Sequence, residues 1–158
     1  CADKSLANLQ LKAGKHTLLI KFLDGASNLN YREFVKSERP FALPARIEAE
    51  DYHHYSDSDP INHGKADNPQ CDRNTGVDAQ TALEDGTCNI GWTVNGEYLE
   101  YTVEVPATGL WEFNLRVASD KPGSAIALMI DELVLEQRTV PQQGWQNFSN
   151  LTFLVALA

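Results

Sequence analysis

The alternation of apolar and polar residues with a period of two is the feature that most restricts the fold of this chain. It runs through the seven residues Trp111–Val117, and Tyr101–Val105 repeats it. Such alternation is typical of a β-strand with one buried face and one face in water. Thr17–Phe22 and Ala125–Ile130 are apolar runs of strand length, and no helical period persists for three turns. The sequence therefore predicts an all-β protein.

Turn signals separate these segments at regular intervals. Each contains Gly, and most also contain Pro or Asp; they are Lys12–Gly14, Asp24–Gly25, Pro106–Gly109 and Asp120–Gly123. Short strands at such spacing favour two packed antiparallel sheets, a β-sandwich of the jelly-roll type. In that fold the apolar side chains of Trp111–Val117 face inward. A chain of 158 residues with 42% hydrophobic residues suffices for one such core, so we expect a single domain.

The charge of the chain argues against several classes of partner. The formal net charge is -9 and the pI is about 4.8, with no cluster of Lys and Arg. Phosphate backbones and anionic membrane surfaces attract basic patches, so no nucleic acid is expected as a partner. No apolar stretch reaches the roughly 18 residues that a membrane-spanning helix needs. We therefore expect no membrane partner either.

Two of the three cysteines, Cys71 and Cys88, bracket a polar stretch, and Cys1 stands apart from them. Their spacing, about that of one hairpin or loop, predicts a disulfide and an oxidising compartment, so we expect a secreted, extracellular protein. Two unpaired thiols are the alternative. No Cys or His spacing typical of a structural zinc site occurs.

Two tryptophans, Trp92 and Trp145, lie in turn sequences at the ends of predicted strands. Trp145 follows Gly144, and polar amides flank both tryptophans. An indole displayed at the edge of a β scaffold offers a flat apolar face with donors and acceptors beside it, which is what a pyranose ring requires. Sugar binding is therefore the first functional expectation.

Several segments, taken together, resemble the family 6 carbohydrate-binding modules. They cover most of the chain and are Leu11–Leu18, Asn28–Phe34, Arg46–Tyr52, Gly76–Gln80, Asn89–Tyr101, Val105–Gly109, Arg116–Ser119 and Gly144–Gln146. Each is weak by itself, whereas their combination is specific. The resemblance implies noncatalytic binding of polysaccharide or oligosaccharide, which targets an attached glycoside hydrolase to its substrate. Agarose-type galactans and β-1,3-glucans are the favoured ligands.

The order of these segments departs from the family pattern. Residues 1–36 resemble the C-terminal strands of a module, residues 46–158 resemble its N-terminal and central part, and residues 37–45 read as a linker. A single module in circularly permuted order over residues 1–158 accounts for this, because the termini of compact domains often lie close together. The alternative is the tail of one module followed by most of a tandem second module.

The resemblance also implies a cleft at one loop end of the sandwich, where two aromatic rings enclose a sugar and an Asn binds its hydroxyls. The matching residues are Trp92, Trp145 and Asn28, with Asn30 as the alternative amide. Indole faces bind the C–H side of a pyranose through apolar contact and dispersion. A buried amide rejects sugars with misplaced hydroxyls, because an unmatched polar group costs about 1–3 kcal/mol. A core position for either indole, or a plain turn amide at Asn28, is the alternative.

The polar loop around Cys71 supplies candidates for the rim of this cleft. Asp72 and Arg73 are the side chains that we expect to add sugar specificity. A solvated loop position is the alternative for each of them. A substitution of either residue that left sugar preference unchanged would remove this hypothesis.

Glu48 and Glu50 flank Ala49, so on a strand both carboxylates would project to the same side. Hard oxygen ligands suit Ca²⁺, which takes six to eight of them. Family 6 modules typically hold a structural calcium near such a Glu-x-Glu, and Glu33 is the candidate that would complete the site. An exposed acidic edge is the alternative.

Two other functional classes stay open. Glycoside hydrolysis requires a pair of carboxyl groups about 5–9.5 Å apart across a cleft, and no acid here is tied to a pocket by sequence. There is also no Gly-x-Ser-x-Gly nucleophile elbow. We therefore expect no catalytic residues, with a hydrolase domain as the weaker alternative. A structural or adhesion β-sandwich, in which Trp92 and Trp145 belong to the core, is the other.

Overall fold

The computed structural model describes residues 14–23, 25, 28–29, 40–58, 61–63, 70–73 and 75–157. These residues form strands almost throughout, together with one short 3-10 helix. The elements are β1 (Gly14–Phe22), β2 (Asn28–Leu29), β3 (Phe41–Ala42), η1 (Ala49–Asp51), β4 (His54–Ser56), β5 (Ala79–Thr81), β6 (Cys88–Ile90), β7 (Tyr98–Val105), β8 (Gly109–Ser119), β9 (Ala125–Ile130), β10 (Leu133–Thr139) and β11 (Gly144–Leu157). Among the residues just given, no helix is long and apolar enough to cross a membrane.

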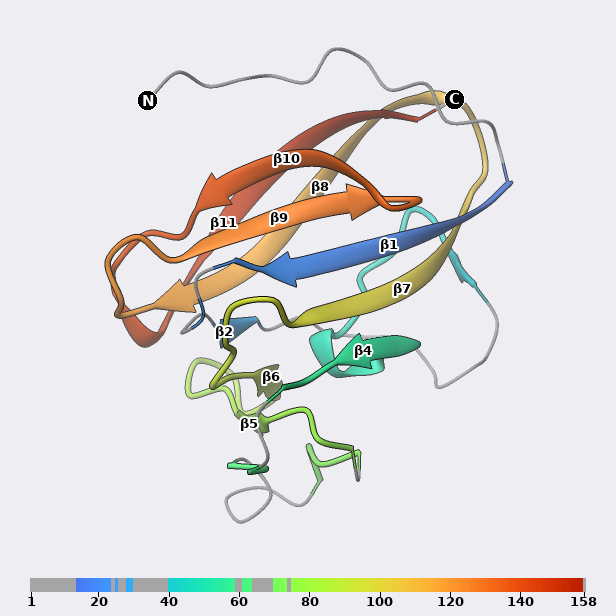
Figure 1. Cartoon of the computed structure of the whole chain (residues 1–158). Helices are drawn as coiled ribbons and strands as arrows, with labels where there is room; N and C mark the ends of the chain where they lie inside the picture. The colour runs from blue at the N-terminus through green and yellow to red at the C-terminus, as the bar shows by residue number, and fades with distance from the viewer. Residues whose placement is uncertain are drawn as a thin grey trace.

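Two sheets stack to form a sandwich (Figure 1). The first, sheet A, has the strand order β10-β9-β1-β7-β3, with β4 also paired to β7. The second, sheet B, has the order β11-β8-β2-β6-β5. The predicted all-β sandwich is confirmed. One ladder differs from the expected antiparallel pattern, because β3 runs parallel to β7.

The core follows the alternation that the sequence predicts. In β7 the buried residues Leu99, Tyr101, Val103 and Val105 alternate with more exposed ones. In β8 the buried Leu115 and Val117 line the same core, and Trp111 and Phe113 pack against it half-buried. β9 is buried over almost its whole length, which accounts for its unbroken apolar sequence.

The first strands of the chain lie inside the sheets. β1 pairs with β7 from Gly14↔Val105 to Lys21↔Tyr98, and with β9 on its other side. β2 lies between β6 and β8. β1 and β2 therefore share the two sheets with the strands that follow residue 46. Part of the expected linker, Phe41–Ala42, forms β3 against β7.

One end of the sandwich collects the segments that carry the predicted sugar site. At this end, β1, β6 and β8 finish and β2, β7, β9 and β11 begin, as their antiparallel registers require. The arrowheads of β1 and β8 point toward it in Figure 1. We call it the Trp92 end, because Trp92 lies in the connection from β6 to β7.

Candidate functional site

Trp92 is displayed by a strained turn. Its φ of 48° lies in the left-handed region, which residues other than glycine seldom adopt and which clusters at functional sites. The residue is 38% exposed. The imidazole of His63 stacks on the indole with ring centroids 5.6 Å apart and planes 20° apart. Because no sugar ring fits in that spacing, the opposite indole face is the one that can receive a ligand.

The buried carboxylate of Glu97 holds the connection that carries Trp92. Its Oε2 accepts a hydrogen bond from the Val94 amide at 2.8 Å, and its Oε1 accepts two from Ser58, from the amide at 3.0 Å and the hydroxyl at 3.2 Å. Since protein donors occupy both oxygens, Glu97 ties the connection to the segment after β4. The residue that stacks on Trp92 is anchored as well. The backbone amide of His63 donates a hydrogen bond to Oδ1 of Asp78.

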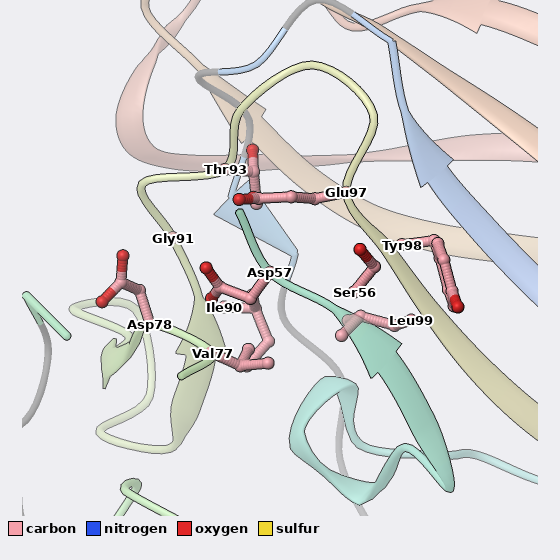
Figure 2. A pocket seen from close by; sticks show the side chains of 10 residues that line it. All are labelled: Ser56, Asp57, Val77, Asp78, Ile90, Gly91, Thr93, Glu97, Tyr98 and Leu99. Carbon is pink, nitrogen blue, oxygen red and sulfur yellow. The ribbon is translucent and has the colours of Figure 1, made fainter. Parts of the chain in front are cut away.

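A small pocket lies between β4, β6 and the start of β7, and Gly91 and Thr93, the two neighbours of Trp92 in the sequence, are among its lining residues (Figure 2). Apolar and acidic side chains both line it, and the lining residues are Ser56, Asp57, Val77, Asp78, Ile90, Gly91, Thr93, Glu97, Tyr98 and Leu99. It has room for about one water molecule, so it does not admit a sugar ring. Three of the lining residues, Asp57, Asp78 and Glu97, carry a carboxyl group.

Trp145 is displayed by a bulge at the start of β11. Gly144 has φ 105°, and a Cβ there would lie 2.8 Å from Nδ2 of Asn147. Gln143 and Asn147 each donate a side-chain hydrogen bond to the other's carbonyl oxygen at 2.6 Å. The register with β8 shifts between Gly144 and Ser149. These two reciprocal hydrogen bonds hold the bulge, in which the side chain of Trp145 is 44% exposed.

The three positions expected to bind sugar come to the same end of sheet B. Gly144, next to Trp145, pairs with Ser119, and Asn28 pairs with the neighbouring Ala118. Leu29 pairs with Ile90, two residues before Trp92. Neither indole belongs to the core. Asn30 lies outside the described residues.

The two rim candidates make contacts within the protein. Oδ1 of Asp72 accepts a hydrogen bond from Nδ2 of Asn62 at 3.4 Å. The guanidinium of Arg73 lies 4.4 Å from the ring centroid of Tyr52, and its Nη1 donates to the carbonyls of Tyr52, at 2.7 Å, and Glu50. Arg73 therefore fastens its loop to the segment around η1.

Cys71 and Cys88 form a disulfide, the pair that the sequence singles out. The bond joins the polar loop to the start of β6. In the same loop, Nδ2 of Asn62 donates to the carbonyl of Thr75 at 3.1 Å. Together these contacts fix the described parts of the loop beside β6 and bring His63 to Trp92.

Glu48 and Glu50 do not lie on a strand, where their spacing would place both carboxylates on one side: Glu48 is the N-cap residue of the 3-10 helix η1, and Glu50 lies within it. The amide of Asp51 donates to the carbonyl of Glu48 at 3.1 Å, closing the turn, and the hydroxyl of Tyr101 donates to the carbonyl of Ala49 at 2.7 Å. These bonds outweigh the local alternation because they satisfy backbone groups in a buried place.

The two glutamates are nevertheless withdrawn from water. Glu48 is buried, and burial raises the pKa of Glu50 above its ordinary value. Oε2 of Glu50 and both amide atoms of the fully buried Asn89 make no hydrogen bond with the described residues. η1 packs against β6, which carries Asn89. Buried oxygens of this kind fit a hard cation.

A complete metal site is not visible within the described part of the chain. There, no group of three His, Cys, Asp or Glu side chains is close enough to hold a metal ion. Glu33, the third expected ligand, lies outside the described residues. The fit to calcium thus depends on the buried oxygens around Glu50.

Two contacts at this site, one made by His63 and one by Gln146, could not be predicted from the sequence. His63 reads as a solvated loop residue, yet it stacks on Trp92. Gln146 attracts no notice beside Trp145, yet its Oε1 accepts a hydrogen bond from the Leu83 amide at 3.0 Å. Neither contact has a local sequence signal, because each joins segments that are distant along the chain.

Comparison with known families gives a match over more than half of the chain. The family model described as carbohydrate binding module (family 6) matches residues 48–158. The match extends from the residue before η1 to the end of β11 and includes both exposed tryptophans. No curated protein and no solved structure matches the chain.

Proposed function

The chain belongs to family 6 of the carbohydrate-binding modules, and we propose that it binds a neutral polysaccharide at the Trp92 end through the faces of Trp92 and Trp145. Carbohydrate binding follows from the family. The observation that carries the proposed location is the exposure of two indoles at the same end of sheet B. Exposed indoles cost free energy in water, and a sugar ring that covers them recovers it.

A neutral polymer suits the charge around the site. The chain carries a net charge of -9, and Asp57, Asp78 and Glu97 line the same pocket as Gly91 and Thr93, the sequence neighbours of Trp92. Like charges disfavour sulfated or uronic acid chains there. Agarose-type galactans and β-1,3-glucans are both neutral, and we propose one of these as the ligand.

In this proposal the module is noncatalytic and holds an attached glycoside hydrolase close to its substrate. Linkage raises the local concentration of the enzyme on the polymer, so even weak binding is useful. The Cys71–Cys88 disulfide supports a secreted protein, because such bonds persist in oxidising compartments.

Calcium is proposed as a structural cofactor near η1. Glu48 and Glu50 would hold it, and Glu33 and Asn89 are further candidates on the chain. The buried oxygens around Glu50 support this assignment. The ion would neutralise carboxylates that the fold withdraws from water.

Titration calorimetry tests the sugar site. Wild type, Trp92→Ala and Trp145→Ala are titrated with agaro-, laminari-, xylo- and cello-oligosaccharides in the presence of calcium. We expect one sugar class to bind wild type, and each substitution to weaken that binding by about 30-fold, as for an aromatic residue at the centre of an interface. Leu154→Ala is the matched control, since Leu154 is exposed on the same strand as Trp145 but far from the Trp92 end.

The opposite outcome would favour a structural or adhesion sandwich. In that case no sugar of the panel binds wild type, and Trp145→Ala lowers the melting temperature. Binding that survives both tryptophan substitutions would instead place the sugar elsewhere on the module.

A further inference from the structure

The turn of residues 82–87, between β5 and β6, is closed by its own hydrogen bonds. The amide of Ala82 donates to the carbonyl of Thr87 at 2.7 Å, and the amide of Gly86 donates to the carbonyl of Ala82 at 2.8 Å. Oδ1 of Asp85 accepts hydrogen bonds from the amide and the hydroxyl of Thr87. The turn is therefore a defined structure.

This 82–87 turn reaches across sheet B. Its Glu84 forms a two-point ion pair with Arg116 of β8, including Nε to Oε1 at 3.1 Å. Its Leu83 amide donates to Gln146 of β11. Because β5 and β11 are at opposite edges of sheet B, the turn folds back over the face of the sheet that points away from the core. Arg116 lies on that face, since its neighbours Leu115 and Val117 are buried in the core.

The turn thereby ties a second exposed apolar residue, Leu83, to the segment that carries Trp145. Leu83 is 79% exposed, the largest value among the exposed large apolar residues. Its amide is bound to the side chain of the residue that follows Trp145. Among the described residues, the hydrogen bond of the Gln146 side chain is made by its Oε1, and its amide nitrogen can act as a donor to a ligand. The segment with the exposed indole and the turn with the exposed apolar side chain are thus held together by this hydrogen bond.

The electrostatics of this place suit an uncharged ligand. Glu84 and Arg116 neutralise each other at the base of the turn, and Asp85 is engaged with Thr87. A charged sugar gains no free partner from these three side chains. A neutral pyranose can use the apolar surface and the single amide donor.

We propose that the 82–87 turn is a wall of the sugar site beside Trp145, which positions Gln146 and offers Leu83 to a second ring of the bound chain. The inference rests on the proposed function, since it requires sugar at Trp145. It adds that the site prefers chains of several rings over short ones. Leu83 and Gln146 contact the ligand, whereas Glu84 and Arg116 are positioning residues.

The dependence of affinity on chain length tests the wall. Wild type, Leu83→Ala and Arg116→Gln are titrated with the disaccharide and the hexasaccharide of whichever neutral series binds, agaro- or laminari-. We expect both substitutions to weaken hexasaccharide binding about five- to tenfold, the effect of losing one side-chain contact, and to leave the disaccharide within about twofold.

Arg138→Gln is the matched control for Arg116→Gln. Arg138 pairs with Glu136 at 2.7 Å on β10, at similar exposure but on sheet A, the sheet that does not carry the 82–87 turn. We expect Arg138→Gln to bind both the disaccharide and the hexasaccharide with the affinity of wild type. Equal melting temperatures of the three variants exclude unfolding as the cause of a loss.

Two results would overturn the proposal in distinguishable ways. If Leu83→Ala binds the hexasaccharide as wild type does while Trp145→Ala does not, the wall is wrong and the proposed function stands. If Leu83→Ala weakens both lengths equally, the turn does not contact a second ring. If wild type binds no sugar, the proposed function fails and the wall with it.

Discussion

Tyr101 connects the core of sheet A to η1. It is buried, and its hydroxyl donates to the carbonyl of Ala49 at 2.7 Å. Burial raises the pKa of Tyr101 well above the ordinary value of 10.0. The pKa in the folded protein thus exceeds that in the unfolded chain, so the stability from the neutral phenol is full below pH 10 and declines as the pH rises further.

The raised pKa of Tyr101 predicts how the stability of Tyr101→Phe depends on pH. At neutral pH the variant should lose about 1 kcal/mol of unfolding free energy, because one buried hydrogen bond is removed. Above pH 10 the difference from wild type should shrink, because the variant no longer has this phenol to ionise on unfolding. Urea unfolding at both pH values measures the effect. A Tyr101 that titrates near pH 10 in the folded protein would contradict the assignment.

At the scale of structural elements, the disulfide holds the polar loop to β6 and should contribute to the stability of the fold. Cys71 and Cys88 are 17 positions apart, and for a loop of about this length the loss of the bond costs on the order of 3 kcal/mol. We expect Cys71→Ser with Cys88→Ser to lower the unfolding free energy by that amount, as measured with urea. Cys1→Ser is the control. A double variant as stable as wild type would mean that the hydrogen bonds of the loop suffice without the bond.

Elements differed in how far the sequence could predict them. β7 and β8 were predictable, because one face of each meets the core and the other meets water along the whole strand. The Glu48–Glu50 segment shares that local alternation but forms η1, because hydrogen bonds to Tyr101 and within the turn decide it. The two exposed tryptophans followed from Gly and amide neighbours. The stacking of His63 and the crossing of the 82–87 turn did not, since they arise from packing between distant segments.

At the scale of the whole molecule, calcium should stabilise the fold. With free calcium about 100-fold above its Kd, binding adds about 2.7 kcal/mol, which for a domain of this size raises the melting temperature by about 5–10 °C. Glu50→Gln should abolish this response. Without calcium at neutral pH the variant should be more stable than wild type, because burial raises the pKa of Glu50 and its ionised form opposes folding.

The difference in stability between Glu50→Gln and wild type without calcium should depend on pH. The stability from the protonated Glu50 is full below its ordinary pKa of 4.5 and is lost as the pH rises through the folded value. The advantage of Glu50→Gln should therefore disappear in acid. Differential scanning calorimetry with calcium and with a chelator measures both effects. An unchanged calcium response in the variant would remove Glu50 from the site.

The interior position of β1 has a consequence for the order of assembly during synthesis. β1 leaves the ribosome well before both of its partners, β7 and β9, which follow it by more than 70 residues. Contacts so far apart along the chain form slowly, because the intervening loop must first be closed. Sheet A therefore stays open until β9 has emerged, and β1 must wait for partners that are made after it.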